Sequence, residues 1–322
     1  MSAAPEGGGV SAVIVTYGRD RVLVETVRRV LELVPPPSEV LVVDQTPRHS
    51  PDVERELEDL AAAAAIDWIR LRDPSIPAAM NVGLRRARSE IVLFLDDDVI
   101  PGPALIAAHR DAHRRSGASV VAGQVLQPGE EPMPGTSTPF RFNAAGRSWV
   151  TEAIGANFSI RRDLALRIGG VDENFVRAAY GYEAELCARA IAAGARVLFE
   201  PGATVRHLRA PAGGTRSYGS HLRTIRPGHS VGAFYRILRT SSPASAPVKI
   251  AGRLARSVRT RHHLRRPWWI PVTLVAETLG LLWAVGLAAR GPRLAMPTGS
   301  RDEALPGREA PAEGDHAAEA AS

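Results

Sequence analysis

The sequence predicts an α/β protein with a mixed, mainly parallel sheet that is flanked by helices. Over about a hundred residues, short apolar runs alternate with segments of helical periodicity, which implies right-handed crossovers between parallel strands. The apolar runs are continuous, as expected of strands buried on both faces. A basic and then apolar segment, residues 216–295, is expected to form a helical C-terminal extension.

Local signals set the limits of the expected elements. Gly18 ends the first strand, and Asp20 can cap the helix that follows. The prolines at 35–37 end that helix, and Gly194 closes a later one. Residues 128–148 are rich in Pro, Gly, Ser and Thr, which indicates a long loop. In order, strands are expected at 10–17, 39–44, 66–71, 90–99, 119–126, 196–199 and 203–207, and helices at 21–33, 51–65, 78–88, 103–116 and 180–193.

Composition is that of an ordinary globular protein. Of the 322 residues, 45% are hydrophobic and 23% are charged, and the formal net charge is +6. The single cysteine, Cys187, excludes an internal disulfide. The first residues lack a basic region followed by an apolar stretch, so we expect no signal peptide and a cytoplasmic location.

Three consecutive aspartates end the apolar run at 90–99. Asp96, Asp97 and Asp98 would repel one another at the C-terminal end of a buried strand unless a cation neutralised them. Oxygen ligands suit Mg²⁺ or Mn²⁺, and this edge of an open α/β sheet is where ligands bind. The alternative interpretation is a solvated acidic turn that caps the next helix. Gly7-Gly8-Gly9 precedes the first strand, so it is not a dinucleotide-binding loop, and no Walker-type loop is found.

The C-terminal third combines a basic run with an apolar one. Residues 253–266 contain six arginines and two histidines with little aromatic interleaving, which argues against nucleic-acid binding. Residues 268–289 are apolar and near the length that spans a bilayer. Three interpretations stay open for them: a helix lying on an anionic membrane surface, a spanning helix, or a helix packed on the main domain or a partner.

Several spaced motifs together resemble the family-two glycosyltransferases of the GT-A fold. In order they are VIVTY, VVDQT, Asn81-x-Gly83, Ala87-Arg88, FLDDDV, GANFSIRR, GGVDENF, an acidic helix start and VRH, and they cover about residues 10–207. The resemblance implies a transferase that uses a nucleotide-diphosphate sugar and a divalent metal, Mg²⁺ or Mn²⁺. It also implies inversion at the anomeric carbon.

The resemblance assigns roles to particular residues. Thr16, Tyr17 and Asp44 stand where relatives hold the base and ribose, and Asp96 would face the ribose. On their own, Tyr17 could merely close a strand and Asp44 cap a turn. The residues implied in nucleotide-sugar binding are Thr16, Tyr17, Asp44, Asn81, Arg88, Asp96, Asp97 and Arg216.

The implied metal ligands are Asp98 and His207. His207 matches a histidine that completes the metal shell in some relatives, although a lone histidine is more often structural. Arg209 and Arg216 flank a Gly-Gly loop that could close over the phosphates, or that could be an exposed linker.

The implied general base is Glu183. Relatives usually place Asp in a Glu-Asp pair at this point, whereas this chain has Tyr182-Glu183-Ala184-Glu185-Leu186. Aligning on Glu185-Leu186 puts Glu183 at the base position, with Tyr182 in place of the partner acid, and Glu185 is expected to anchor the helix. The alternative is that both acids only complement the helix dipole.

These observations predict the organisation and activity of the chain. We expect a flexible N-terminus (1–9), a catalytic domain (10–215, with halves 10–98 and 99–215), the extension (216–295) and a disordered tail (296–322). The expected activity is metal-assisted glycosyl transfer to an unknown acceptor hydroxyl, with a lipid-linked glycan and the inner face of the cell membrane as candidate partners and nucleic acid excluded. The alternatives are a nucleotide-sugar binding protein without turnover and a nucleotidyltransferase on a similar sheet.

Overall fold

One nine-stranded sheet organises the computed structural model, which describes residues 9–135, 140–218 and 224–295. The strand order is β3-β2-β1-β4-β8-β6-β9-β5, and β7 pairs with β9. Residues 1–8 of the predicted flexible N-terminus (1–9) and the predicted tail 296–322 lie outside the described residues. The strands are β1 (Val10–Thr16), β2 (Glu39–Asp44), β3 (Asp67–Arg70), β4 (Ile91–Leu95), β5 (Val99–Pro101), β6 (Val120–Leu126), β7 (Ser148–Val150), β8 (Asn157–Arg161) and β9 (Val197–His207).

The sheet is parallel in its N-terminal half and mixed beyond it. β1 pairs in parallel with β2 and β4, and β2 pairs in parallel with β3. β8 then runs antiparallel to both β4 and β6. This mixed α/β architecture confirms the predicted fold class, and it brings the carboxyl ends of β1 and β4 to one edge of the sheet.

Both faces of the central strands are buried, as their continuous apolar runs predict. In β4, Val92 and Phe94 pack into one core, whereas Ile91, Leu93 and Leu95 pack into another. This alternation follows from the two-residue period of a strand, which sends successive side chains to opposite faces. Helices therefore cover the sheet on both sides.

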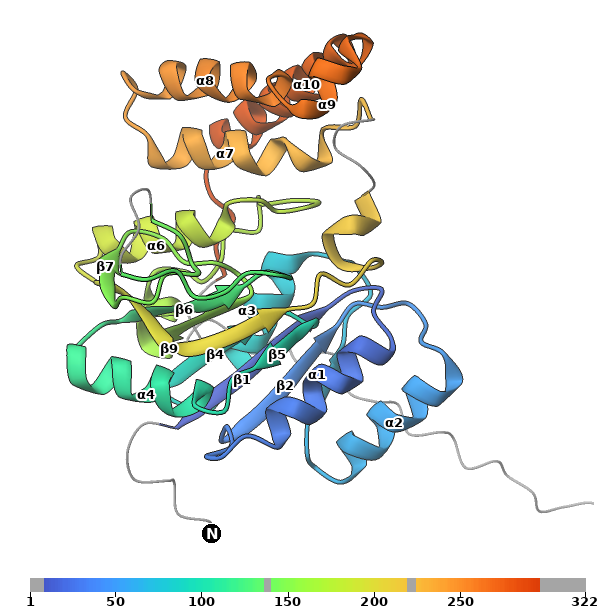
Figure 1. The fold of residues 1–322 in the computed structure, drawn as a ribbon, viewed down its shortest axis with the longest axis vertical. Helices are drawn as coiled ribbons and strands as arrows, with labels where there is room; N and C mark the ends of the chain where they lie inside the picture. The colour runs from blue at the N-terminus through green and yellow to red at the C-terminus, as the bar shows by residue number, and fades with distance from the viewer. Residues whose placement is uncertain (1–8, 136–139, 219–223, 296–322) are drawn as a thin grey trace, which may run out of the picture.

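The helices form two groups in Figure 1: those that flank the sheet, and a layer of α7, α8, α9 and α10 above α6. The flanking helices are α1 (Arg21–Leu31), α2 (Pro51–Ala62), α3 (Ile76–Arg86), α4 (Leu105–Ser116), α5 (Arg162–Arg167) and α6 (Tyr182–Ala192). The layer contains α7 (Val231–Thr240), α8 (Ala246–Val258), α9 (Arg261–Arg265) and α10 (Ile270–Ala289). Single 3₁₀ turns are η1 (Gly214–Tyr218), η2 (Pro227–His229) and η3 (Pro267–Trp269).

Some boundaries differ from those predicted, for local reasons. α3 begins at Ile76 because the Ser75 side chain accepts a hydrogen bond from the Ala78 amide and Pro77 fits the first turn. The two strands predicted at 196–199 and 203–207 form the single strand β9, since a register shift between Gly123 and Gln124 of β6 accommodates the interruption. The aspartates lead into the short strand β5, so the predicted alternative of a helix cap at this point is wrong.

The C-terminal layer shares its core with the sheet domain. Phe234 and Tyr235 of α7 belong to the same core as Val92 and Phe94 of β4. The Tyr235 hydroxyl also donates a 2.7 Å hydrogen bond to Asp172, which lies in the GGVDENF motif. The helical extension is therefore integrated with the main domain through burial and hydrogen bonding.

Helix α10 has one packed face and one exposed apolar face. The segment Pro267–Ala289 is long and apolar enough to cross a membrane by length and composition. Glu277 on its packed face pairs with Arg253 of α8 at 3.0 Å, and Gly280 and Ala284 are also buried. Its exposed side chains, called the apolar face below, are Leu274, Val275, Leu279, Leu282 and Val285.

Candidate active site

A cavity of about 460 Å³ lies at the carboxyl ends of β1 and β4. Asp96, Asp97 and Asp98 follow β4, and Thr16 and Tyr17 end β1. Segments distant in the sequence close the cavity, through Glu183 at the start of α6, His207 at the end of β9 and His229 of η2. The cavity thus joins the predicted aspartate, base and metal positions in one space.

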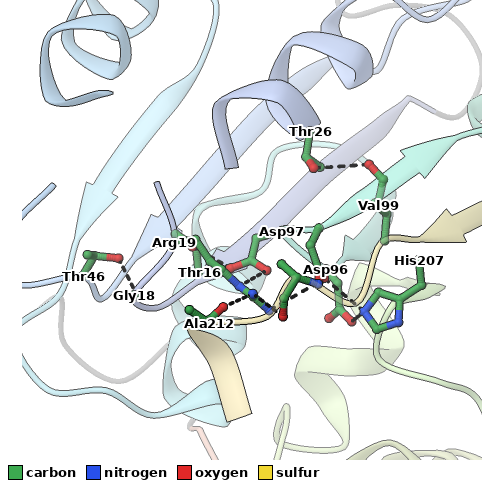
Figure 2. A network of polar contacts seen from close by, with 12 residues as sticks. Thr16, Gly18, Arg19, Thr26, Thr46, Asp96, Asp97, Val99, His207 and Ala212 are labelled. Atoms are coloured by element: carbon green, nitrogen blue, oxygen red, sulfur yellow. Dashed lines mark hydrogen bonds and ion pairs between the residues drawn. The ribbon is translucent and has the colours of Figure 1, made fainter. Parts of the chain in front are cut away.

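Arg19 pairs with Asp97 and Asp98, and Figure 2 shows it beside Asp97. Its Nε lies 3.2 Å from Asp97 Oδ1, and its Nη2 lies 3.4 Å from Asp98 Oδ2. The same guanidinium donates hydrogen bonds to the carbonyls of Ala210 and Ala212. Arg19 therefore neutralises the carboxylates and ties the segment after His207 to them.

Asp96, Asp98 and His207 form a group that could hold a metal ion. Their candidate ligand atoms all lie within 4.8 Å of one another. His207 Nε2 is 3.0 Å from Asp98 Oδ1 and 3.6 Å from Asp96 Oδ2. The other ring nitrogen, Nδ1, donates to Gln127 Oε1 at 3.1 Å, which leaves Nε2 to face the carboxylates. Two carboxylates and one imidazole fit a divalent cation such as Mn²⁺. Asp96 joins this group, although it was expected to face the ribose.

Each aspartate has its own electrostatic environment. Burial in the cavity, opposed by the charge of His207 and aided by the charges of Asp97 and Asp98, raises the pKa of Asp96. Burial raises the pKa of Asp97 to about 6, against the opposing effect of Arg19. Burial also disfavours ionised Asp98, but its hydrogen bond with His207 and the charge of Arg19 outweigh this and lower its pKa. Protons and cations thus compete most directly at Asp96.

Glu183 faces the cavity from the first turn of α6. Its Oε1 accepts a 3.1 Å hydrogen bond from the Gly155 amide. Burial raises the pKa of Glu183 to about 7, and the Gly155 hydrogen bond and the charge of Arg236 only partly oppose that rise. A carboxylate with a pKa near neutrality, positioned over a cavity, has the properties of a general base. Glu185 instead accepts hydrogen bonds from Arg189 of the same helix, as expected of an anchor.

Thr16 and Tyr17 line the cavity, but Asp44 does not reach it. Thr16 Oγ1 donates a 2.7 Å hydrogen bond to Asp97, so it positions that carboxylate. Asp44 is 1% exposed and accepts hydrogen bonds from Trp68 Nε1 and the Thr46 amide, and its carboxylate pairs with His49. Its oxygens are occupied inside the protein, and its contact with the nucleotide base stays a prediction.

Two further predicted ligands lie elsewhere. The Asn81 side chain is buried and forms 2.8 Å hydrogen bonds with both the amide and the carbonyl of Val171, so it fastens α3 to the GGVDENF motif. Arg88 is 82% exposed and pairs with Glu39 at 2.8 Å. Because Arg88 precedes β4, it lies at the amino edge of the parallel strands, opposite the aspartates. Both residues make contacts within the protein, and their predicted roles in binding the nucleotide sugar stay predictions.

The segment after His207 crosses the cavity. The Ala210 amide donates to Asp98 Oδ2 at 2.7 Å, and the Gly214 amide donates to the Tyr17 carbonyl at 2.7 Å. Gly214 and Thr215 line the cavity, consistent with the loop expected there. The side chain of Arg216 lies outside the described part of the structure.

Residues 11–169 match the family model described as Glycosyl transferase family 2. This region is a family 2 glycosyltransferase domain. No match to a curated protein sequence was found. The family match and the fold agree with the expectation from the motifs, and they favour glycosyl transfer over nucleotidyl transfer.

Solved structures share the fold of this chain. The mannosyltransferase PcManGT from Pyrobaculum calidifontis, in complex with GDP-Man and Mn²⁺, superposes with a TM-score of 0.55 at 19% identity, over 89% of this chain and 80% of that one. GalNAc-T7 with UDP, GalNAc and Mn²⁺ gives 0.53 at 14% identity, over 63% of this chain. S. aureus TarS gives 0.51 at 14% identity, over 79% of this chain. This chain spans 44% of the length of the GalNAc-T7 and TarS chains.

Sequence reasoning missed three residues that build the site. Arg19 and Gln127 reach the aspartates and His207 only through tertiary contacts, and no local pattern distinguishes them. Gly155 could have been identified from the sequence, because it is the first residue of the GANFSIRR motif. A side chain there would meet the Tyr182 hydroxyl at 2.2 Å, so only glycine leaves room for the first turn of α6.

Proposed function

We propose that this glycosyltransferase moves a sugar from a nucleotide-diphosphate donor to an acceptor hydroxyl, with inversion and with Glu183 as the general base. One observation carries the proposal: Glu183 and the Asp96–Asp98–His207 group line the same cavity. A group that removes a proton and a group suited to a phosphate-bound cation therefore face a shared space, as an in-line displacement requires.

The proposed reaction assigns a task to each residue. The acceptor oxygen forms a bond to the anomeric carbon as the bond from that carbon to the phosphate oxygen breaks. The Glu183 carboxylate takes the hydroxyl proton, and the electron pair leaves with the nucleoside diphosphate. Asp96, Asp98 and His207 would hold a divalent cation, which neutralises charge on the departing diphosphate.

A donor panel tests the proposal. UDP-, GDP- and dTDP-sugars would be mixed with the protein in Mn²⁺ or Mg²⁺, and thermal stability and release of nucleoside diphosphate would be followed. We expect one donor to stabilise the protein only with metal, because a ligand of the folded state raises its stability. Glu183→Gln should retain this stabilisation and lose most of the release, whereas Glu58→Gln, an exposed acid on α2, should match the native protein. Stabilisation without release by the native protein, even with membranes added as an acceptor source, would support the alternative of a binding protein without turnover.

We also propose that the apolar face of α10 rests on an anionic membrane surface. Leu282 on this face is 64% exposed and Trp268 before it is 67% exposed, although most large apolar side chains are buried. Arg261, Arg265 and Arg266 are exposed beside them and complement anionic lipid. The pairing of Glu277 with Arg253 holds the opposite face of α10 against α8, which favours a surface position over a spanning one.

Vesicle sedimentation tests this surface. The native protein should sediment with phosphatidylglycerol vesicles more than with phosphatidylcholine vesicles, and less so in high salt. Leu282→Asp should reduce binding, whereas Val34→Asp, at an apolar residue that is 83% exposed far from α10, should not. Equal binding by Leu282→Asp and the native protein would contradict the proposal, as would extraction only by detergent, which would indicate a spanning helix.

A further inference from the structure

Two smaller cavities lie in and beside the helical layer and share lining residues with the active-site cavity or with each other. The first, called the groove, has a volume of about 250 Å³ and shares Ile154, Tyr180 and Glu183 with the active-site cavity. The second, called the basic pocket, has a volume of about 280 Å³ and shares Ala233 and Arg236 with the groove. Glu183 and Arg236 both line the groove, and each also lines one of the two cavities beside it.

The basic pocket combines three guanidinium groups with hydroxyl groups. Arg236 comes from α7, and Arg253 and Arg256 come from α8. Two carboxylates oppose them. Glu277 pairs with Arg253 at 3.0 Å, and Glu152 pairs with Arg236 at 3.8 Å. The hydroxyl groups that line the pocket belong to Ser257, Thr260 and Thr273.

This donor set fits a phosphate group. Three guanidiniums against two carboxylates leave a net positive charge, and the guanidiniums offer N–H donors from two helices. The hydroxyls already have partners, since Ser257 donates to the Leu254 carbonyl and Thr260 and Thr273 bond to the His263 ring. Guanidinium forks match the oxygens of phosphate, which accepts more hydrogen bonds than a single carboxylate does. The donor's own diphosphate has a separate place on the other side of Glu183, beside Asp96, Asp98 and His207.

We propose that the groove and the basic pocket bind an acceptor that carries a phosphate group, with its reacting hydroxyl at Glu183 and its phosphate at Arg236 and Arg256. This assignment rests on the proposed function, since it requires Glu183 to be the base. It defines the acceptor by two features, a sugar-like hydroxyl and a phosphate, separated by the length of the groove. The phosphate belongs either to a lipid-linked molecule or to a soluble glycosyl phosphate.

The layer itself connects the pocket to the surface proposed for lipid. Thr273 and Glu277 line the basic pocket from the packed face of α10, whose other face is apolar and exposed. A lipid phosphate entering along this layer would thus meet the arginines before its sugar reached Glu183. A soluble glycosyl phosphate would use the same arginines without contact to the apolar face.

Calorimetric titration tests the assignment with defined probes. The probes are dodecyl phosphate and glucose 1-phosphate, with dodecyl maltoside and glucose as neutral counterparts. We expect the phosphates to bind the native protein and the neutral compounds to bind at least tenfold more weakly. Arg256→Gln should weaken phosphate binding about tenfold, and Arg256→Lys, which keeps the charge, should restore part of it. Arg259→Gln, an exposed neighbour outside the pocket, is the matched control and should bind as the native protein does.

The results distinguish a lipid phosphate from a soluble one, and they distinguish a failure of the acceptor site from a failure of the proposed function. Tighter binding of dodecyl phosphate than of glucose 1-phosphate would identify a lipid phosphate, and the reverse order would identify a soluble one. The assignment is overturned if neither phosphate binds, or if Arg256→Gln binds both as the native protein does. A native protein that binds a nucleotide sugar and releases its diphosphate, yet binds neither phosphate probe, would refute the acceptor site and leave the proposed function standing.

Discussion

The protonation state of Glu183 is set by burial, which raises its pKa to about 7. A general base must be ionised to accept a proton. As the pH falls below the pKa of Glu183, its carboxylate becomes protonated and can no longer act as the base. The measurement uses saturating Mn²⁺ so that the carboxylates around the metal do not titrate. Under these conditions we expect kcat/KM to fall about tenfold per pH unit below pH 7 and to level off above pH 7. A flat profile between pH 5 and 8 would contradict the role of Glu183.

Gly155 controls the position of that base. A Cβ atom there would lie 2.2 Å from the Tyr182 hydroxyl and 3.0 Å from Glu183 Oε1. Gly155→Ala should therefore displace the first turn of α6 and lower kcat about a hundredfold, since small misplacements of catalytic groups are costly. Donor binding, followed by thermal shift, should change much less. Equal losses in both measurements would indicate general unfolding.

The sequence predicts the charged residues of the site better than their partners. Asp96, Asp98, His207 and Glu183 lie in motifs with fixed spacing, and the fold brings them to one cavity. Arg19 could not be predicted because its carboxylate and carbonyl partners come from a distant loop. Asn81 and Arg88 also lie in motifs, but their side chains serve helix docking and an exposed ion pair.

At the scale of elements, α10 supports the active site by packing against η2 and against Ser230, the residue that follows it. Gly280 of α10 lies against Ser230, where a Cβ atom would approach Ser230 Oγ to 2.1 Å. The neighbouring His229 lines the active-site cavity. The helix thus supports a wall of the cavity while its other face remains exposed.

A substitution at Gly280 should loosen this support. We expect Gly280→Val to lower the free energy of unfolding by about 1–3 kcal/mol, measured in urea, because added methyl groups overpack the contact. Gly286→Val is the matched control on the same helix, since a Cβ there meets nothing within 4 Å. Similar stabilities for the two variants would show that the close contact between Gly280 and Ser230 is dispensable.

Element boundaries were predictable where a local signal existed. Pro51 begins α2 as the sequence indicates, and β1 ends at Thr16, one residue before its predicted end. Strands β5 and β7 each have only a few residues, and their pairing with β9 depends on a partner distant in sequence. The antiparallel direction of β8 likewise follows from sheet topology, which no local pattern records.

Across the whole molecule, two buried histidines join α4 to the centre of the sheet. His109 and His113 share Ser159 Oγ as a hydrogen-bond partner at 2.8 Å, and His109 also contacts Asn157. Burial lowers the pKa of His109 to about 4 and that of His113 to about 3. The folded protein therefore keeps both rings neutral, whereas the unfolded chain protonates them near 6.5.

This difference predicts acid sensitivity. Because the unfolded state binds more protons below pH 6.5, the free energy of unfolding should decrease as pH falls toward 4, by about 1.4 kcal/mol per histidine and pH unit. Urea unfolding between pH 7 and 4.5 measures the slope. His113→Gln, which keeps a hydrogen-bonding group but cannot titrate, should reduce the contribution of this pair by half. An unchanged slope would place the acid sensitivity elsewhere.

The two oxygens of Asp98 perform separate tasks. Oδ2 accepts from the Ala210 amide and from Arg19, whereas Oδ1 lies 3.0 Å from His207 Nε2. Removing the Asp98 side chain would therefore release a chain segment and delete a cation ligand in one step. Asp96 carries no such anchoring hydrogen bond to the segment in the described residues. Asp96→Asn therefore changes the charge at the cation site without releasing the chain segment. It should raise the Mn²⁺ concentration needed for half-maximal stabilisation, while the chain around Ala210 stays resistant to proteolysis.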